Sequence, residues 1–365
     1  MVILYENNLL WCAFSRKLLV FHSSNEHEEL EIPEPELPKE SVKENNGKNI
    51  TCITSSKDSE YTAITTQNKQ LIVYNKVFKP IRNIKLPKVA NKICFAPNNE
   101  LLVADKNGDV WAYNVNIDNE KPVLLLGHLS IIIDMIISPC GKYIITCDRD
   151  EKIRVSHYPN SYNIAMFCLG HKEFVTQLHL LKNNVLLSAS GDGTVRMWNY
   201  LEGKQLNMLD CNDRVEESIL KKIVNELHKE EEIDISRLPV CNMQVQENDN
   251  NVILAISLYK IPKIYLYKLN SENLKCSYVN HIEVEKENFS FFLSSRLYII
   301  TDKVTGYNFN NNDVDLVACK LLDETISRYK DLLNHSTNCS TLFYKKKHNN
   351  IEDYLFRKKQ RLESK

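Results

Sequence analysis

The sequence predicts an all-β protein: a β-propeller of about seven blades with a helical insertion and a C-terminal helical, basic tail. Two observations support this prediction. Short apolar runs of strand type recur in pairs around tight turns, and the recurring unit ends at Tyr74, Tyr113, Ser156 and Trp198, which are 39, 43 and 42 residues apart. A period of about 40–45 residues with several short strands is typical of propeller blades. A closed ring of blades also leaves few exposed sheet edges.

Length and composition agree with one large repetitive domain. The chain has 365 residues, which exceeds an ordinary compact domain of roughly 100–200 residues. We assign residues 1–322 to the propeller and residues 323–365 to the tail. With 46 basic and 47 acidic residues, the chain is not a generally polybasic nucleic-acid binder, although a local basic patch remains compatible.

The 11 cysteines contain no C-x-x-C pair, so we expect no structural zinc site. The N-terminus lacks the pattern of a signal peptide, and we therefore expect reduced intracellular thiols rather than a disulfide framework.

The fullest repeat runs from Gly170 to Trp198. In this unit we expect a hydrogen-bonded chain that locks three strands in register, made by His171, a strand hydroxyl (Ser188 or Ser190), Asp192 and Trp198. This pattern resembles the WD-repeat family. The preceding unit repeats the pattern with His128 and with Asp150 in the turn, and it ends in Ser156 instead of Trp. We predict structural rather than catalytic roles for both histidines.

Weaker units continue on both sides, and three segments interrupt the repeat. Leu9–Phe21 reads as a lone strand pair, whereas Ile253–Leu269 and Phe289–Phe309 read as further blades. Residues 22–48 hold eight Glu, three Lys and three Pro, which predicts a solvated acidic loop. Residues 212–238 contain an apolar residue at every fourth position, which predicts an inserted helix packed on the propeller wall: Val215, Ile219, Ile223 and Leu227.

The tail is predicted to begin with a short helix and to end in a basic one. The first helix is indicated by Ile326, Tyr329 and Leu333, and the second by Ile351 and Leu355. Residues 342–365 hold eight basic and three acidic residues, and seven basic ones are candidate contacts: Lys345, Lys346, Lys347, Arg357, Lys358, Lys359 and Arg361. Such a cluster can neutralise nucleic-acid phosphates, direct nuclear import, or form a solvated terminus.

The turn after the strand that ends at Thr146-Cys147 is unusually charged. Asp148-Arg-Asp-Glu-Lys152 places five charges in five positions, and Arg154 follows on the next strand. One interpretation is a solvated loop with an ordinary strand arginine, since Arg196 occupies the equivalent place. The other is a polar patch in which Glu151 and Arg154, joined by Lys172, pair with the charges of a partner.

Sequence motifs for catalysis are missing. There is no G-x-S-x-G elbow, no Gly-Lys followed by Ser or Thr, and no G-x-G-x-x-G behind a strand. We therefore expect no catalytic, metal or cofactor site, and no pocket for S-adenosylmethionine.

Four motifs occur together and in order: Leu101-Leu-Val-Ala-Asp-Lys-Asn-Gly-Asp-Val110, Leu126-Gly-His-Leu-Ser130, Asp148-Arg-Asp-Glu-Lys-Ile-Arg-Val-Ser156 and Cys168-Leu-Gly-His-Lys-Glu-Phe-Val175. This combination resembles the WD-repeat, non-catalytic subunits of the eukaryotic tRNA (guanine-N7-)-methyltransferase.

The resemblance implies a heterodimer. A separate Rossmann-type subunit binds S-adenosylmethionine and methylates a guanine in the tRNA variable loop, while the propeller stabilises that subunit and helps to position the tRNA. It also implies that Glu151 and Arg154, with Lys172, contact the catalytic subunit and that the tail contacts tRNA. The complex is expected to work in the nucleus only or in both the nucleus and the cytoplasm, and to bind no membrane.

Two other functions remain open on the sequence. A generic WD-repeat adaptor, such as a substrate receptor for ubiquitin ligation or a chromatin scaffold, would have the same fold but no need for the charged turn. A propeller enzyme would need a catalytic constellation, for which the motifs give no support.

Overall fold

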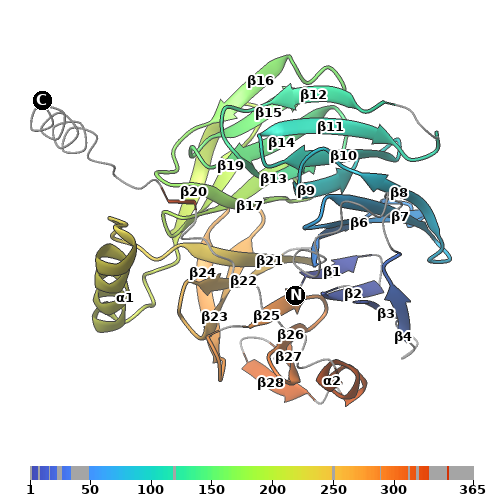
Figure 1. Cartoon of the computed structure of the whole chain (residues 1–365). Coiled ribbons are helices and arrows are strands. Elements are labelled where there is room, and N and C mark those ends of the chain that lie inside the picture. The colour runs from blue at the N-terminus through green and yellow to red at the C-terminus, as the bar shows by residue number, and fades with distance from the viewer. Residues whose placement is uncertain are drawn as a thin grey trace, which may run out of the picture.

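Four-stranded antiparallel sheets are the building unit of the molecule, and seven of them form a ring (Figure 1). The computed structural model describes residues 2–6, 9–15, 17–22, 27–33, 49–117, 121–248, 251–287, 289–310, 313–317, 320–328 and 343–344. Each sheet consists of four strands that follow one another in the sequence. The predicted all-β propeller of about seven blades is confirmed.

Blades 1 to 4 use the first half of the chain. Blade 1 contains β1 (Val2–Glu6), β2 (Leu9–Phe14), β3 (Lys17–Phe21) and β4 (His27–Glu31). Blade 2 contains β5 (Ile50–Ser55), β6 (Tyr61–Thr66), β7 (Gln70–Asn75) and β8 (Pro80–Lys85). Blade 3 contains β9 (Ala90–Phe95), β10 (Glu100–Asp105), β11 (Asp109–Asn114) and β12 (Val123–Gly127). Blade 4 contains β13 (Ile132–Ile137), β14 (Tyr143–Asp148), β15 (Ile153–His157) and β16 (Ile164–Cys168).

Blades 5 to 7 complete the ring, and two helices interrupt or follow them. Blade 5 contains β17 (Val175–Leu180), β18 (Val185–Ser190), β19 (Thr194–Asn199) and β20 (Lys204–Asp210). Helix α1 (Glu217–Glu231) precedes blade 6, which contains β21 (Val240–Asn248), β22 (Asn251–Leu258), β23 (Lys263–Asn270) and β24 (Cys276–Glu283). Blade 7 contains β25 (Ser290–Leu293), β26 (Leu297–Ile300), β27 (Val304–Asn310) and β28 (Asp313–Val317), and helix α2 (Lys320–Ser327) follows.

The first strand of each blade lies at the centre of the ring. These seven strands contact one another in the order β1, β5, β9, β13, β17, β21 and β25, and β25 returns to β1. Polar side chains add links between neighbours: Lys92 Nζ lies 2.8 Å from Asp134 Oδ1, and Asp134 Oδ2 accepts the Leu178 N–H at 2.8 Å. The inner strands of blades 3, 4 and 5 are thereby connected through one carboxylate.

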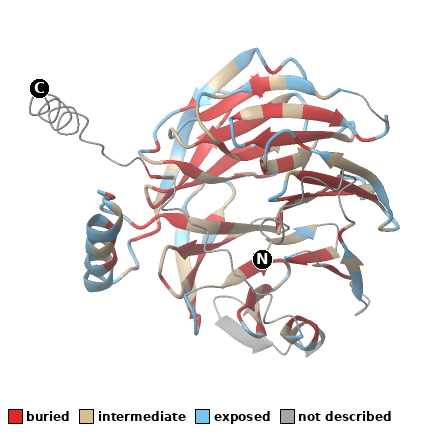
Figure 2. Ribbon diagram, viewed as in Figure 1, coloured by how far each residue is buried: buried red, intermediate tan, exposed pale blue. Residues whose placement is uncertain are grey.

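The middle strands of each blade are covered on both faces by the neighbouring blades, and Figure 2 shows them as buried. All six residues of β18 are buried. A strand enclosed in this way reads as an apolar run without alternation, which is the signal that the sequence carries. The outer strands β12 and β16, by contrast, leave apolar side chains exposed, including Val123 and Phe167.

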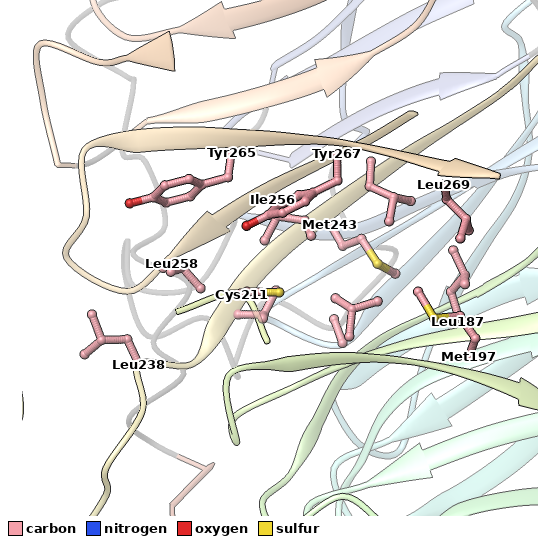
Figure 3. Close-up of a cluster of buried hydrophobic side chains, with 14 of the residues drawn as sticks. Leu187, Met197, Cys211, Leu238, Met243, Ile256, Leu258, Tyr265, Tyr267 and Leu269 are labelled. Atoms are coloured by element: carbon pink, nitrogen blue, oxygen red, sulfur yellow. The ribbon is translucent and has the colours of Figure 1, made fainter. Parts of the chain in front are cut away.

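Helix α1 lies within the segment 212–238, where the apolar stripe predicted a helix. Ile223 and Leu227 are buried in the cluster between blades 5 and 6, part of which Figure 3 shows. Ile219 is 38% exposed, so the stripe does not bury all its members. A four-residue step advances about 40° beyond one helical turn, which carries Ile219 away from the buried side. Val215 lies before the helix and packs on the same cluster.

The N-terminal predictions need two corrections. Leu9–Phe21 is not a lone strand pair, because β1 and β4 complete a four-stranded blade around it. The predicted acidic loop over residues 22–48 is wrong for His27–Glu31, which forms β4. As the outermost strand, β4 places its glutamates in solvent, where Glu29 pairs with Lys17, while Leu30 packs inward. Residues 23–26 and 34–48 lie outside the described residues.

The C-terminal boundary also differs from the prediction. Helix α2 begins at Lys320, three residues before the expected start of the tail. Its Ile326 is fully buried in a cluster that joins blade 1 and blade 7, including Phe21 and Phe292. Tyr329, Leu333, Ile351 and Leu355 lie outside the described residues. Neither described helix has the length and apolarity needed to cross a membrane.

Replacing Ile326 by alanine should destabilise the junction between the first and last blades. The change removes buried methyl groups and leaves a cavity, so the free energy of unfolding should fall by about 2–5 kcal/mol in urea titrations. Ile219→Ala is the matched control, because this side chain is partly exposed and should cost much less. Equal losses for the two variants would show that α2 does not stabilise the ring.

Candidate functional site

The residues predicted for the fullest repeat form a continuous hydrogen-bonded chain in blade 5. His171 Nδ1 lies 3.0 Å from Asp192 Oδ2, and His171 Nε2 lies 2.7 Å from Ser188 Oγ. Trp198 Nε1 donates to the same Ser188 hydroxyl at 2.8 Å. The strand hydroxyl is therefore Ser188, and Ser190 donates instead to the carbonyl of Phe174. The chain joins the loop before β17 to β18 and β19.

Asp192 is the most heavily bonded member of this chain. It accepts hydrogen bonds from the Thr194 hydroxyl at 2.6 Å and from the Lys172 N–H at 3.0 Å, besides His171. Burial would raise the pKa of Asp192, but these hydrogen bonds outweigh burial and hold its pKa well below the usual range. Burial lowers the pKa of His171 despite the opposing effect of Asp192.

Blade 4 uses a different carboxylate from the one predicted. His128 Nδ1 lies 2.9 Å from Asp148 Oδ2, and His128 Nε2 lies 2.8 Å from Thr146 Oγ1. The role predicted for Asp150 therefore belongs to Asp148, the last residue of β14. Its Oδ1 accepts the Asp150 N–H at 2.9 Å, which shapes the charged turn. The Ser156 hydroxyl, at the place of Trp198, is buried and has no hydrogen-bond partner among the residues that the structure describes.

The two histidines are poorly placed for catalysis. Their side chains are 4% and 0% exposed for His128 and His171, and both ring nitrogens of each make hydrogen bonds within the blade. A general base must reach the proton of a bound substrate. Their geometry therefore supports the structural interpretation.

The turns and loops of blades 4 and 5 build one surface, which we call the turn face. It comprises the loops 128–131 and 169–174 and the turns 149–152 and 191–193. Backbone hydrogen bonds join the turns to the loops, from Arg149 N–H to Ile131 O at 3.1 Å and from Gly191 N–H to Phe174 O at 2.8 Å. Glu151 and Lys172 both lie on the turn face, and the Lys172 side chain is exposed.

Arg154 and Arg196 occupy equivalent strand positions, because they pair with Thr146 and Ser188, respectively. Each is only 9% exposed, but their hydrogen bonding differs. Arg196 reaches three acceptors, with Nη1 to Gln205 at 2.8 Å, Nε to Thr194 at 3.3 Å and Nη2 to Asp192 at 3.4 Å.

Within the described part of the chain, Arg154 donates only from Nη1, to Gly127 O at 2.9 Å, and its Nε is buried without an acceptor. Burial lowers the pKa of Arg154, although Asp148 opposes this effect. A buried Nε–H without an acceptor is costly in the free chain, and a carboxylate from outside would relieve that cost.

Two apolar residues of the turn face were not found by sequence reasoning. Leu129 is fully exposed, and Leu169 is 64% exposed. Leu129 directly follows His128, at the position where blade 5 has Lys172. An apolar residue after the Gly-His pair was the available signal. Single exposed leucines are common, but two on one small surface beside an under-bonded arginine favour a binding surface.

Outside the turn face, the described residues offer few side chains that could form a binding or catalytic site. A groove between blades 1 and 2 includes His22, Glu28, Glu60 and Lys76. Its charges pair with each other, Lys76 with Glu60 at 3.1 Å and His22 with Glu28 at 3.2 Å. No group of three or more metal-binding side chains gathers in the described parts of the chain. The seven candidate basic residues of the tail lie outside them.

Comparison with known proteins gives the family. A family model described as the WD40 domain of the tRNA methyltransferase TRM82 matches residues 116–306. A Drosophila mojavensis protein named tRNA (guanine-N(7)-)-methyltransferase non-catalytic subunit wuho is 32% identical over 350 residues, covering 89% of this chain and 84% of the relative. A Xenopus laevis protein named as the non-catalytic subunit wdr4 of the same enzyme is 37% identical over 230 residues, covering 61% of this chain and 54% of the relative.

Solved structures agree on the fold alone. A chain in a crystal structure of a mitotic checkpoint complex has a TM-score of 0.64 and 13% identity, covering 82% of this chain and 83% of that one. The β-propeller domain of Myceliophteria_thermophila Cps50 (Swd1) has a TM-score of 0.62 and 12% identity, covering 86% of this chain and 95% of that domain.

Asp192→Ala should destabilise blade 5. His171, Thr194 and the Lys172 N–H would each lose an acceptor, and the free energy of unfolding should fall by roughly 1–3 kcal/mol in a denaturant titration. Asp213→Ala provides the control, because Asp213 is exposed. An unchanged midpoint for Asp192→Ala would mean that the chain does not stabilise the blade.

The propeller should lose stability in acid through His171. Its pKa in the folded state is lowered by burial, so the unfolded chain binds the proton more strongly, and stability should fall as the pH drops below about 6.5. Asp192 adds a loss below about pH 4, because its folded-state pKa is also lowered. Unfolding titrations at pH 7, 6 and 5 should show a weaker pH dependence for His171→Gln than for the wild type. Identical dependence would contradict the assignment.

Proposed function

The chain belongs to the family of tRNA (guanine-N7-)-methyltransferase non-catalytic subunits, and on that premise we propose that it binds the catalytic subunit through its turn face and helps to position tRNA. The family resemblance predicted from the motifs is confirmed, and the chain is a non-catalytic subunit. Membership of this family favours a methyltransferase subunit over the two alternatives, a generic WD-repeat adaptor and a propeller enzyme.

The observation that carries the proposal is the contrast between Arg154 and Arg196. At the same strand position, the described residues give the guanidinium three acceptors in blade 5 and a single acceptor in blade 4. Planar guanidinium groups pair well with carboxylates. We infer that an acidic side chain of the catalytic subunit approaches Arg154 beside the charged turn.

Charge and apolar surface surround that position. Glu151 stands in the turn with a positive φ of 65°, which turns the chain sharply between β14 and β15. Lys172 contributes a cation, and Leu129 and Leu169 contribute apolar contact area. An interface with a buried centre and a charged rim gains affinity mainly from the centre. Glu151 and Lys172 would then set the orientation of the partner.

The remaining parts of the proposal concern the cofactor, the tRNA and the cellular location of the complex. S-adenosylmethionine would be bound by the catalytic subunit and not by this chain. The basic tail, with eight basic and three acidic residues in residues 342–365, would contact tRNA phosphates. The complex would act in the nucleus only, or in both the nucleus and the cytoplasm. Nuclear import by the tail is the competing role for the same charges.

Arg154→Gln should weaken binding of the catalytic subunit by about 2–5 kcal/mol, measured by calorimetric titration of the purified subunits. The propeller should lose less stability than with Arg196→Gln, because Arg154 makes fewer hydrogen bonds within the blade. Leu129→Ser should weaken the complex, whereas Val77→Ser, at a 69% exposed valine of blade 2, should not.

The equivalent arginine supplies the decisive control. Should Arg196→Gln weaken the complex as much as Arg154→Gln, without first unfolding the propeller, the turn of blade 4 would not be a dedicated binding site. Glu151→Lys and Lys172→Glu should weaken binding in a salt-dependent way, as expected for charges at a solvated rim.

A further inference from the structure

Phe343 and Tyr344 contact blade 5 far from their place in the sequence. The Tyr344 hydroxyl donates to Gly191 O at 2.7 Å, across 153 positions of the chain. Its ring stands edge-on to Phe174 with centroids 4.9 Å apart, and the Phe343 ring lies 5.6 Å from the same phenylalanine. Tyr344 is 5% exposed. The contact therefore buries a large side chain and satisfies its hydroxyl.

The surface that receives these rings is built from several segments. Phe174 precedes β17 and is 1% exposed, Ile133 belongs to β13, and Ile233 and Ile235 follow α1. We call this set, together with Gly191, the aromatic pocket. Blade 4, blade 5 and the inserted segment thus meet at the place where Tyr344 is held.

The pocket is held in shape by blade 5 itself. Phe174 O accepts the Gly191 N–H at 2.8 Å and the Ser190 hydroxyl at 2.9 Å. A side chain at Gly191 would place its Cβ 2.5 Å from the Phe174 ring, so this position must stay without one. Burial raises the pKa of Tyr344, and the hydroxyl remains a donor at neutral pH.

We propose that Phe343 and Tyr344 form an anchor that fixes where the basic C-terminal segment leaves the propeller, so that its lysines are presented beside the turn face to tRNA. This inference rests on the proposed function, because tRNA binding by the tail is part of it. Gly191 belongs to the turn face, and the proposed contacts of the catalytic subunit lie on the same surface.

The covalent connection to Tyr344 limits how far the next three lysines can lie from the aromatic pocket. Lys345, Lys346 and Lys347 directly follow Tyr344, so they lie within about 11 Å of it, at most 3.6 Å per residue. The last described residue before the anchor is Arg328, 15 positions before Phe343. Anchoring therefore raises the effective concentration of positive charge beside the catalytic subunit.

The test uses the full complex with the catalytic subunit and measures tRNA affinity at fixed salt. The variants are Tyr344→Ala, Tyr344→Phe and a truncation that ends at Tyr344. Tyr344→Ala should weaken tRNA binding several-fold, by most of the loss caused by truncation. Adding Tyr344→Ala to the truncated chain should cause no further loss. Tyr344→Phe keeps the ring contact and should lie between wild type and Tyr344→Ala.

A second measurement reports the anchor without tRNA. Trypsin should cleave after Lys345, Lys346 and Lys347 several-fold faster in Tyr344→Ala than in the wild type, because the anchored chain resists entry into the protease cleft. Equal cleavage rates would overturn the anchor. The affinity of Tyr344→Ala for the catalytic subunit should stay close to wild type.

The outcomes separate this inference from the proposed function. If truncation weakens tRNA binding but Tyr344→Ala does not, the anchor is wrong and the tail still contacts tRNA. If truncation leaves tRNA affinity unchanged, both the tail contact and the anchor's role are overturned. Binding of the catalytic subunit through Arg154 is measured separately and would stand in either case.

Discussion

Closure of the ring is the constraint on which the rest of the structure depends. Each blade is a continuous stretch of four strands, so the first and last blades meet through packing of β1 and β25 rather than through a shared sheet. Helix α2 places Ile326 in that junction, against apolar residues of both blades. Because the middle strands are covered on both faces only when every neighbour is present, a loss at the junction exposes core on both sides.

Local hydrogen-bonded chains hold the loops at the ends of the packed strands in fixed positions. In blade 5, the chain from His171 to Trp198 ties a loop, a strand and a turn together. Blade 4 keeps the histidine and a carboxylate but has Ser156 in place of the tryptophan. The hydrogen bonds of Asp148 still hold the charged turn in place, while the described residues provide Arg154 with one acceptor. Of the two blades with the histidine pattern, the one without the tryptophan is thus the one whose strand arginine keeps a buried Nε–H without an acceptor among the described residues.

The sequence predicts the fold well because the repeat period and the apolar strand runs are local signals that packing reinforces. It fails where two arrangements share one pattern. Asp148 and Asp150 lie 20 and 22 residues after His128, on either side of the 21-residue interval in blade 5, so spacing alone cannot choose between them. The glutamates of β4 suggest a loop because composition does not reveal an outer strand with a solvated face. The hydrogen bond from Arg154 to Gly127 and the contact between Tyr344 and Gly191 join segments that are far apart in the sequence, and they leave no sequence pattern.

Arg154 and Tyr344 point to the same conclusion about how this subunit works. The buried Nε–H of Arg154, which has no acceptor among the described residues, costs free energy in the isolated chain, and a partner that supplied the acceptor would recover that cost. The aromatic pocket, by contrast, is filled from within by the chain's own C-terminal segment. The turn face therefore combines an incomplete site with a completed one. Arg154 would favour binding of the catalytic subunit, and the anchored Phe343 and Tyr344 would hold the positive charge of the tail next to that subunit. Binding of the partner and approach of a polyanion would then be coupled only because both take place on the same surface.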